Sequence, residues 1–246
     1  MLRAGPISST SATAFRDWIG MAIRRKGEIE RLISEISERI GSPADIYMIG
    51  GGAMMYLGRK FYTKDVDLVV RTRREYDDVF GALIRLGFRS VRPGNGYGRM
   101  NLSSILEDDE GRRVDLFESR VCDKLRFSEG MAARSVRRFS AGGVSLSTCA
   151  PEDILIFKTV TERPGDAADC ESILRGTRIR WDLIMDEIRD QIRDGEEVWI
   201  TWIADGMYVL AEKSGYDIPI LDELISMADG FLERWEAGLP GSDPAP

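Results

Sequence analysis

The hydrophobic pattern of the chain changes character near residues 149–151. Before that point, short apolar runs alternate with glycines, turn residues and segments of helical period. After it, from Glu152 to about Trp235, the apolar residues recur only at helical spacing. The pattern predicts an α+β fold, in which a mixed sheet with flanking helices is followed by a C-terminal helical region. The predicted units are an α/β core with an N-terminal helix at 1–149, a helical domain at 150–236 and a disordered tail at 237–246.

Two kinds of element are expected in the first unit. The strand candidates are Ile46–Ile49, Asp65–Val70, Phe88–Val91, Asn101–Leu106, Arg113–Phe117 and Val144–Ser147. The helix candidates are Phe15–Ile40, Ala53–Leu57 and Arg74–Leu86, with glycines at 41, 58 and 87 as stops.

Composition excludes several classes of chemistry. The 246 residues contain no histidine, so a Ser-His-Asp triad, a Cys-His pair and an imidazole-ligated zinc site are excluded. Cys122, Cys149 and Cys170 are scattered, which favours free thiols over a partial metal site. No apolar run has the length of a membrane span, and residues 1–13 lack an apolar signal core. We therefore expect a cytoplasmic protein that acts through carboxylates, Lys, Arg, hydroxyls or an oxygen-bound metal.

The triplet Gly50-Gly51-Gly52 follows one short strand candidate and precedes a short helix candidate. Glycines at such a junction let the backbone approach a bulky anion, and the first N–H groups of a helix can bind phosphate. The spacing matches neither a dinucleotide-binding fingerprint nor a Walker loop. A tight strand-to-helix turn without a ligand remains an alternative.

Three aspartates stand on strand candidates. Asp65 and Asp67 are two residues apart and should share one face of a strand, with Val66 and Leu68 on the other. Aligned carboxylates repel each other unless a cation lies between them, and Mg²⁺ prefers such oxygen ligands. Asp115 on a neighbouring strand could complete a two-metal site. The alternative is an exposed strand face with solvated aspartates.

The combination of these motifs resembles the DNA polymerase β-like nucleotidyltransferase superfamily. Residues 49–53 (IGGGA) and 63–69 (TKDVDLV) are similar to the "GGxA … TKDxDL" signature of small prokaryotic and toxin-type nucleotidyltransferases, relatives of abortive-infection toxins. Residues 151–158 (PEDILIFK) and 163–169 (RPGDAAD) resemble a second signature of that family. The resemblance covers about residues 46–174, and it implies a nucleotidyltransferase-like α/β core for the first unit.

The resemblance assigns roles to the acidic residues and to the glycines. Gly50 and Gly51 would hold the triphosphate of an NTP, and Asp65 and Asp67 would ligate Mg²⁺, with two ions expected. Asp115 would be the third metal carboxylate and the general base on the acceptor hydroxyl. The implied reaction moves an NMP from the NTP to RNA, a protein or a small molecule and releases pyrophosphate.

Further candidate residues lie within the two signatures. Thr63 and Lys64 belong to the first signature, and Asp166 and Asp169 of the second would be structural or would position the acceptor. Lys158 would reach the nucleotide phosphates. The chain has 6 lysines against 28 arginines, which makes a lysine within an apolar helix noteworthy, although a solvated lysine is the alternative.

Two features keep other functions open. Many members of the family carry Gly-Ser where this chain has Gly50-Gly51, so a non-catalytic protein that binds a nucleotide or another protein is the alternative to an enzyme. An unrelated α/β domain is the third alternative, which would hold if the aspartates did not converge. Residues 182–236 contain 15 acidic and 4 basic residues, and this region could bind a basic partner protein, as in a toxin–antitoxin pair.

Residues outside the motifs are assigned to packing or to the surface. The basic stretch Arg112–Arg138 could guide an acceptor or be a solvated face. The C-terminal aromatics are expected to pack the helical core, and a nucleobase pocket built from one or two of them is the less favoured alternative: Trp181, Trp199, Trp202, Tyr208, Tyr216 and Trp235.

Overall fold

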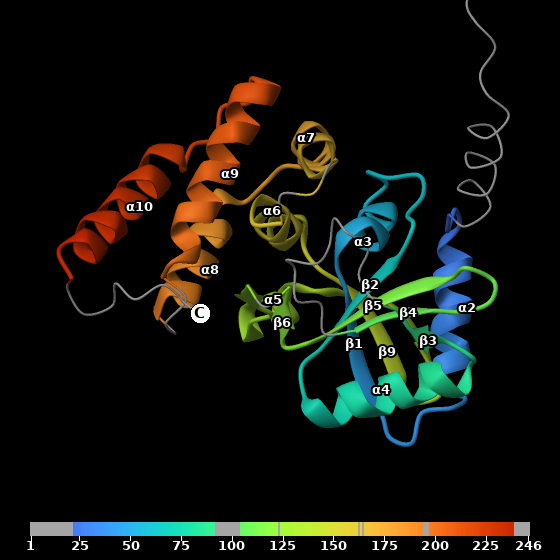
Figure 1. Ribbon diagram of the computed structural model, residues 1–246. Helices are drawn as coiled ribbons and strands as arrows, with labels where there is room; N and C mark the ends of the chain where they lie inside the picture. Colours follow the sequence, from blue (N-terminus) through green and yellow to red (C-terminus); the bar gives the residue numbers. More distant parts are fainter. Residues whose placement is uncertain are drawn as a thin grey trace, which may run out of the picture.

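The computed structural model describes residues 22–91, 104–122, 124–161, 163, 165–193 and 197–238. A mixed sheet with helices packed on it forms one side of the molecule, and a group of helices from the second half of the chain forms the other (Figure 1). The α/β part has these elements: α2 (Lys26–Ser37), β1 (Ala44–Met48), α3 (Gly50–Tyr56), β2 (Val66–Val70), α4 (Arg73–Arg85), β3 (Arg89–Ser90), β4 (Ser104–Glu107), β5 (Arg113–Glu118), β6 (Arg120–Val121), β7 (Leu125–Arg126), α5 (Glu129–Arg134), β8 (Val136–Ala141) and β9 (Val144–Thr148). The helices that follow are α6 (Pro151–Thr159), α7 (Asp166–Gly176), α8 (Trp181–Arg193), α9 (Trp199–Ser214) and α10 (Leu221–Glu236).

The main sheet has seven strands in the order β3-β4-β5-β2-β1-β9-β8. The pairs β2–β5 and β1–β9 are parallel, whereas β1–β2, β3–β4, β4–β5 and β8–β9 are antiparallel. The central strands β2 and β5 run side by side in one direction, so residues at equivalent positions in these two strands lie next to each other. This register positions the candidate site.

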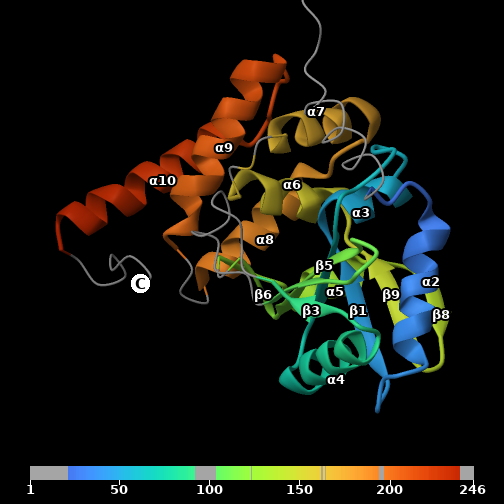
Figure 2. The ribbon, with the colours of Figure 1, turned by 45° about the vertical axis from the view of Figure 1, so that its right-hand side comes forward.

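Helices α2 and α4 cover one face of the sheet (Figure 2). Their apolar residues, such as Ile33 and Leu83, pack on Leu68, Leu116 and Leu146. Helix α4 begins where Thr72 and Glu75 form a reciprocal capping box, which satisfies backbone N–H groups that the first turn leaves unpaired. The sequence expectation of an amphipathic helix at this position is confirmed.

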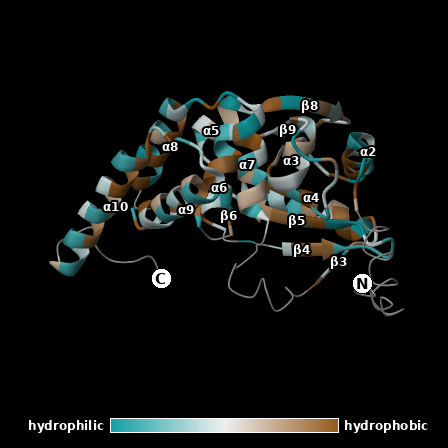
Figure 3. Cartoon of the chain, turned by 90° about the horizontal axis from the view of Figure 1, so that it is seen from above, coloured by the Kyte–Doolittle hydropathy of each residue, from teal (hydrophilic) through white to brown (hydrophobic). Residues whose placement is uncertain are grey.

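The other face of the sheet shares its core with the C-terminal helices. Val69 of β2 and Phe117 of β5 belong to one apolar cluster with Leu155 of α6, Ile203 of α9 and Phe231 of α10. In Figure 3 the hydrophobic colour dominates β5, whereas α8 and α10 alternate along their length, as helices with one apolar face do. Burial of this common core holds the helical part against the sheet.

A buried ionic network joins α5, α6 and α8. The guanidinium of Arg134 donates to Asp153, with Nε 2.9 Å from Oδ1, and to Glu187, with Nη2 2.5 Å from Oε2. Glu187 also accepts from Ser128 and from Gln191, each at 2.9 Å. Because every carboxylate in the network has a donor, its burial is tolerated.

The expected architecture of a mixed sheet with flanking helices is confirmed, and the main sheet of the described residues has seven strands. Several element boundaries and one strand differ from the sequence prediction. The helix α3 begins at Gly50 itself, rather than after the glycines, and β8 was not expected. Residues 15–21 of the first predicted helix, 101–103 of the predicted fourth strand and 239–246 of the predicted tail lie outside the described residues.

Other expectations concern particular side chains. The three cysteines are buried and form no disulfide. Of the six C-terminal aromatics, Trp181 and Trp199 pack against the core, but four do not, which corrects the expectation: Trp202, Tyr208, Tyr216 and Trp235 are at least one-third exposed. No described helix has the length and apolarity needed to cross a membrane.

Candidate functional site

Three carboxylates meet at the centre of the sheet. Asp67 lies in β2 beside Asp115 of β5, because the parallel pairing sets these two residues in register. Asp65 immediately precedes β2 and shares the side of Asp67, as residues two apart do along a strand. Oxygen atoms of all three side chains lie within 4.8 Å of one another, and the described residues contain no other such group. An unrelated α/β domain was the alternative if the three aspartates did not converge, and they do converge.

The electrostatics of the group favour a bound cation. Burial first, and then the charges of Asp65 and Asp115, raise the pKa of Asp67 to about 8. Burial likewise raises the pKa of Asp115, which is completely inaccessible. With a pKa of about 8, Asp67 holds a proton at neutral pH unless a positive charge replaces it. A hard cation with oxygen ligands such as Mg²⁺ fits this donor set.

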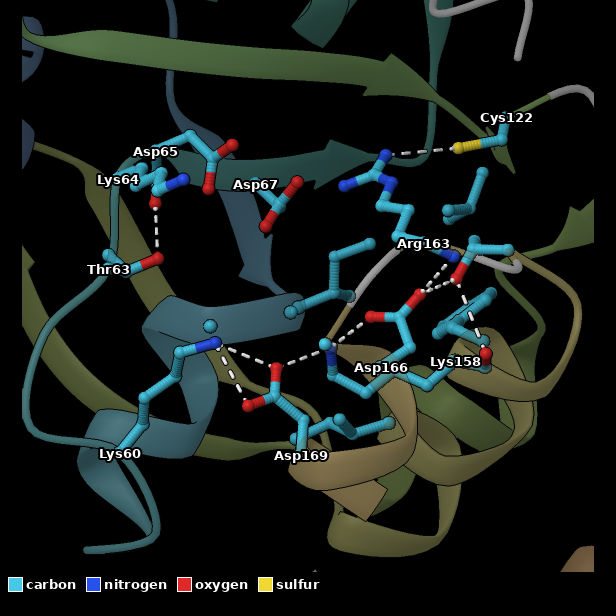
Figure 4. A pocket seen from close by; sticks show the side chains of 18 of the residues that line it. Lys60, Thr63, Lys64, Asp65, Asp67, Cys122, Lys158, Arg163, Asp166 and Asp169 are labelled. Carbon is cyan, nitrogen blue, oxygen red and sulfur yellow. Dashed lines mark hydrogen bonds and ion pairs between the residues drawn. The ribbon is translucent and has the colours of Figure 1, made fainter. Parts of the chain in front are cut away.

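Arginine side chains occupy two sides of the carboxylate group. Arg113 donates to both oxygens of Asp115, at 2.9 and 3.1 Å, as a two-pronged pair. Figure 4 shows the guanidinium of Arg163 directed toward Asp67, and it also lies 3.7 Å from the sulfur of Cys122. Burial disfavours the charge of Arg163, but its carboxylate neighbours, Asp67 first among them, raise its pKa above the ordinary value.

The glycines at the start of α3 provide space for two of the site's side chains. Gly50 has φ +59°, and a Cβ there would lie 2.2 Å from Oδ2 of Asp67. At Gly51 a Cβ would lie 2.4 Å from Oγ1 of Thr63. That hydroxyl donates to the backbone carbonyl of Asp65 at 3.0 Å. The side chains of Asp67 and Thr63 therefore occupy the space next to the Cα atoms of these glycines. Both glycines also line the cavity described below, and their expected contact with phosphate stays a prediction.

A second charged group lies across from the carboxylates (Figure 4). Lys158 of α6 contacts Asp166 at 2.7 Å and Asp169 at 2.8 Å, and Lys60 approaches Asp169 to 2.7 Å. Asp166 also accepts from the hydroxyl of Thr161 at 2.6 Å and from the backbone N–H of Arg163 at 3.0 Å. Asp166 and Asp169 therefore hold two lysines and the segment that leads to Arg163.

One cavity of about 840 Å³ connects these groups. Asp65, Asp67, Asp166 and Asp169 line it, together with Gly50 and Gly51. Four of the six lysines in the chain line it as well: Lys60, Lys64, Lys124 and Lys158. The volume falls within the range of about 300–1,000 Å³ that small-molecule sites occupy. A cavity with converging carboxylates on one side and several cations on the other can hold a metal ion and a polyanion together.

The structure brings nearly all the expected residues to this cavity. Thr63, Lys64 and Lys158 line it, as do the four aspartates and two glycines named above. Asp115 lies behind Asp67, within the carboxylate group but not in the cavity wall. Sequence reasoning missed Lys60, Lys124, Arg163 and Arg113, and it favoured a place in the core for Trp202. The scarcity of lysine was a usable signal for the first two, because it had already singled out Lys158.

No protein-family model matches the chain, and no curated protein is similar to it in sequence.

Proposed function

We propose that the protein is a Mg²⁺-dependent nucleotidyltransferase, which moves an NMP from an NTP to an acceptor hydroxyl and releases pyrophosphate. One observation carries the proposal. The carboxylates of Asp65, Asp67 and Asp115 converge within 4.8 Å beside a cavity that four lysines line. Metal-binding oxygens next to cations are what a nucleoside triphosphate and its metal require. The resemblance of residues 46–174 to the nucleotidyltransferase superfamily supports the same reading.

The residues of the cavity would have different roles in this reaction. Asp65 and Asp67 would hold the metal ions, with Asp115 as the third ligand or as the base that accepts the proton of the acceptor hydroxyl. Lys158 and Lys60 would exchange contacts with Asp166 and Asp169 for contacts with the phosphates. Bound Mg²⁺ would neutralise charge on the phosphates and activate the attacking oxygen. Catalysis would then rest mainly on positioning and on electrostatic stabilisation.

The resemblance draws attention to a missing hydroxyl at position 51. Thr63 supplies a hydroxyl in the same place, since its Oγ1 occupies the space that a side chain at position 51 would need. The loss of the serine therefore does not leave this part of the cavity without a hydroxyl.

Isothermal titration with ATP, CTP, GTP and UTP, with and without Mg²⁺, tests the proposal. We expect Mg²⁺-dependent binding of at least one NTP, and its loss in the double variant Asp65→Ala/Asp67→Ala. Asp186→Ala/Asp190→Ala is the matched control, because these two acids are exposed on α8. If none of the NTPs binds the wild-type protein, the proposal is wrong.

A non-catalytic nucleotide-binding protein is the second candidate. The pair between Arg113 and Asp115 favours it, because both oxygens of the proposed base already accept from a guanidinium. The two candidates differ in turnover. An enzyme transfers label from an α-labelled NTP to an acceptor in a cell extract and releases pyrophosphate, whereas a binding protein does neither.

A further inference from the structure

Trp202 is an aromatic side chain in the cavity wall that lies outside the apolar core cluster, with its ring against that of Trp199. It lies on α9, whose buried residues, including Ile200 and Ile203, face the apolar cluster. The side chain of Trp202 is 37% exposed, and it lines the same cavity as Asp65 and Asp67. A large exposed aromatic side chain in a concave site indicates a ligand contact, because its flat ring can pack against a bound molecule.

Lys124 lies against this tryptophan. Its ammonium is 3.8 Å from the centroid of the Trp202 ring, and it donates a hydrogen bond to the backbone carbonyl of Val160. These contacts hold the ammonium in the cavity wall next to the ring. The ammonium therefore covers part of one face of the ring and fixes a hydrogen-bond donor there, while the Trp202 side chain stays 37% exposed.

The cavity has two chemically different ends. The carboxylates and Lys158 form the polar end. From there Arg163 reaches Cys122, which lies in the loop between β6 and β7 that also carries Lys124. The wall along this path includes Phe117, Val121 and Phe157, all buried and apolar. The lining that leads from the carboxylates to Trp202 therefore combines apolar side chains with the cations Arg163 and Lys124.

We propose that Trp202 and Lys124 form the nucleobase subsite of the nucleotide that the cavity binds; this inference rests on the proposed function. With the phosphates beside the carboxylates, the base extends along the apolar wall and packs against the part of the Trp202 ring that Lys124 leaves exposed. Lys124 has donors and no acceptor, so its ammonium is directed to a carbonyl oxygen or ring nitrogen on the edge of the base. Stacking of this kind tolerates every base, and Lys124 adds the polar contact.

The test compares an NTP with inorganic tripolyphosphate, which has the phosphates but no base. Both are titrated in the presence of Mg²⁺ into the wild type, Trp202→Ala, Trp202→Phe and Lys124→Met. Loss of stacking weakens NTP binding by Trp202→Ala about five- to 150-fold. We expect tripolyphosphate to bind this variant within about twofold of the wild type, and Trp202→Phe to retain most of the NTP affinity. Tyr208→Ala is the control, because Tyr208 is exposed on the same helix and does not line the cavity.

Any other result of this experiment would overturn the proposed nucleobase subsite. Wild-type NTP affinity in Trp202→Ala would show that the base lies elsewhere, and a loss of transfer alone in that variant would assign Trp202 to the acceptor. Equal losses for NTP and tripolyphosphate would mean that the substitution perturbs the whole cavity. These results leave the proposed function intact if the wild type binds an NTP. A wild type that binds neither ligand with Mg²⁺ refutes the proposed function and the subsite with it.

Discussion

The backbone of Gly50 faces the carboxylate of Asp67 so closely that a Cβ at position 50 would lie 2.2 Å from Oδ2. The same glycine adopts φ +59°, a conformation that L side chains rarely accept. The turn from β1 into α3 therefore serves the carboxylate group directly. Without it, Asp67 could not keep its place beside Asp65 and Asp115.

Gly50→Ala should both destabilise the protein and abolish Mg²⁺ binding. The positive φ alone costs about 1–2 kcal/mol, and displacing Asp67 adds a packing cost of about 1–3 kcal/mol. Gly58→Ala separates the two effects, because Gly58 has φ +71° with nothing within 4 Å of an added Cβ. We expect Gly58→Ala to lose only the first amount and to bind Mg²⁺ normally. Urea denaturation and calorimetric titration measure both quantities, and equal behaviour of the two variants would contradict the steric argument.

Gly51→Ser, which introduces the serine that the resemblance led us to expect, should destabilise this protein. The new Cβ would lie 2.4 Å from Oγ1 of Thr63, so we expect a loss of about 1–3 kcal/mol. Thr63→Ala removes the obstructing hydroxyl and its bond to the carbonyl of Asp65, at a cost of about 1 kcal/mol. The double variant should lose less than the sum of the two, which a double-mutant cycle of denaturation free energies detects. Additive losses would show that the two positions do not compete for space.

The metal-free protein should become less stable as pH rises, through Asp67. Burial first, then Asp65 and Asp115, raise the pKa of Asp67 to about 8, against an ordinary value of 3.8. Between these values the folded state keeps a proton that the unfolded state has lost, so the free energy of unfolding falls with pH. Asp67→Asn lacks this dependence. In EDTA, its melting temperature should exceed that of the wild type by more at pH 8.5 than at pH 5; a constant difference would refute the raised pKa.

Mg²⁺ should bind more tightly as pH rises, for the same reason. Below about pH 8 the ion competes with the proton on Asp67, so its apparent affinity increases from pH 6 to pH 8.5. Calorimetric titration in buffers of different ionisation enthalpy also counts the protons released. If affinity is independent of pH and no proton is released, Asp67 is ionised before the metal arrives.

The local hydrophobic pattern predicted the strand that positions the site, because the side chains of a strand alternate between its two faces. The alternation of residues 65–70 placed Asp67 opposite Val66 and Leu68, and the structure has that strand at Val66–Val70. The parallel neighbour of β2 could not be read from pattern alone, since register depends on contacts far apart in the sequence. Strand β8 was missed because it is an edge strand with a bulge between Arg137 and Phe139, where little alternation survives.

Residues that act through long-range contacts were the ones that sequence reasoning missed. Arg163 and Lys124 reach the cavity from loops whose course the pattern does not reveal. Trp202 was assigned to the core because aromatic residues in helices usually pack there. Only the fold of α9 against α6 shows that this side chain lies in the cavity wall.

Arg134→Met should destabilise the protein strongly, because it leaves the carboxylates of Asp153 and Glu187 buried without their cation. Breaking such a buried pair costs about 3–5 kcal/mol. Arg175→Met is the control, since the exposed pair of Arg175 with Glu171 contributes less than about 0.5 kcal/mol. Burial already raises the pKa of Asp153 to about 6 with Arg134 in place, so removing the guanidinium raises it further. Protonation then relieves part of the cost, and urea denaturation should show a smaller loss at pH 5 than at pH 7.5. An equal loss at both values would mean that Arg134 stabilises the fold by packing rather than by charge.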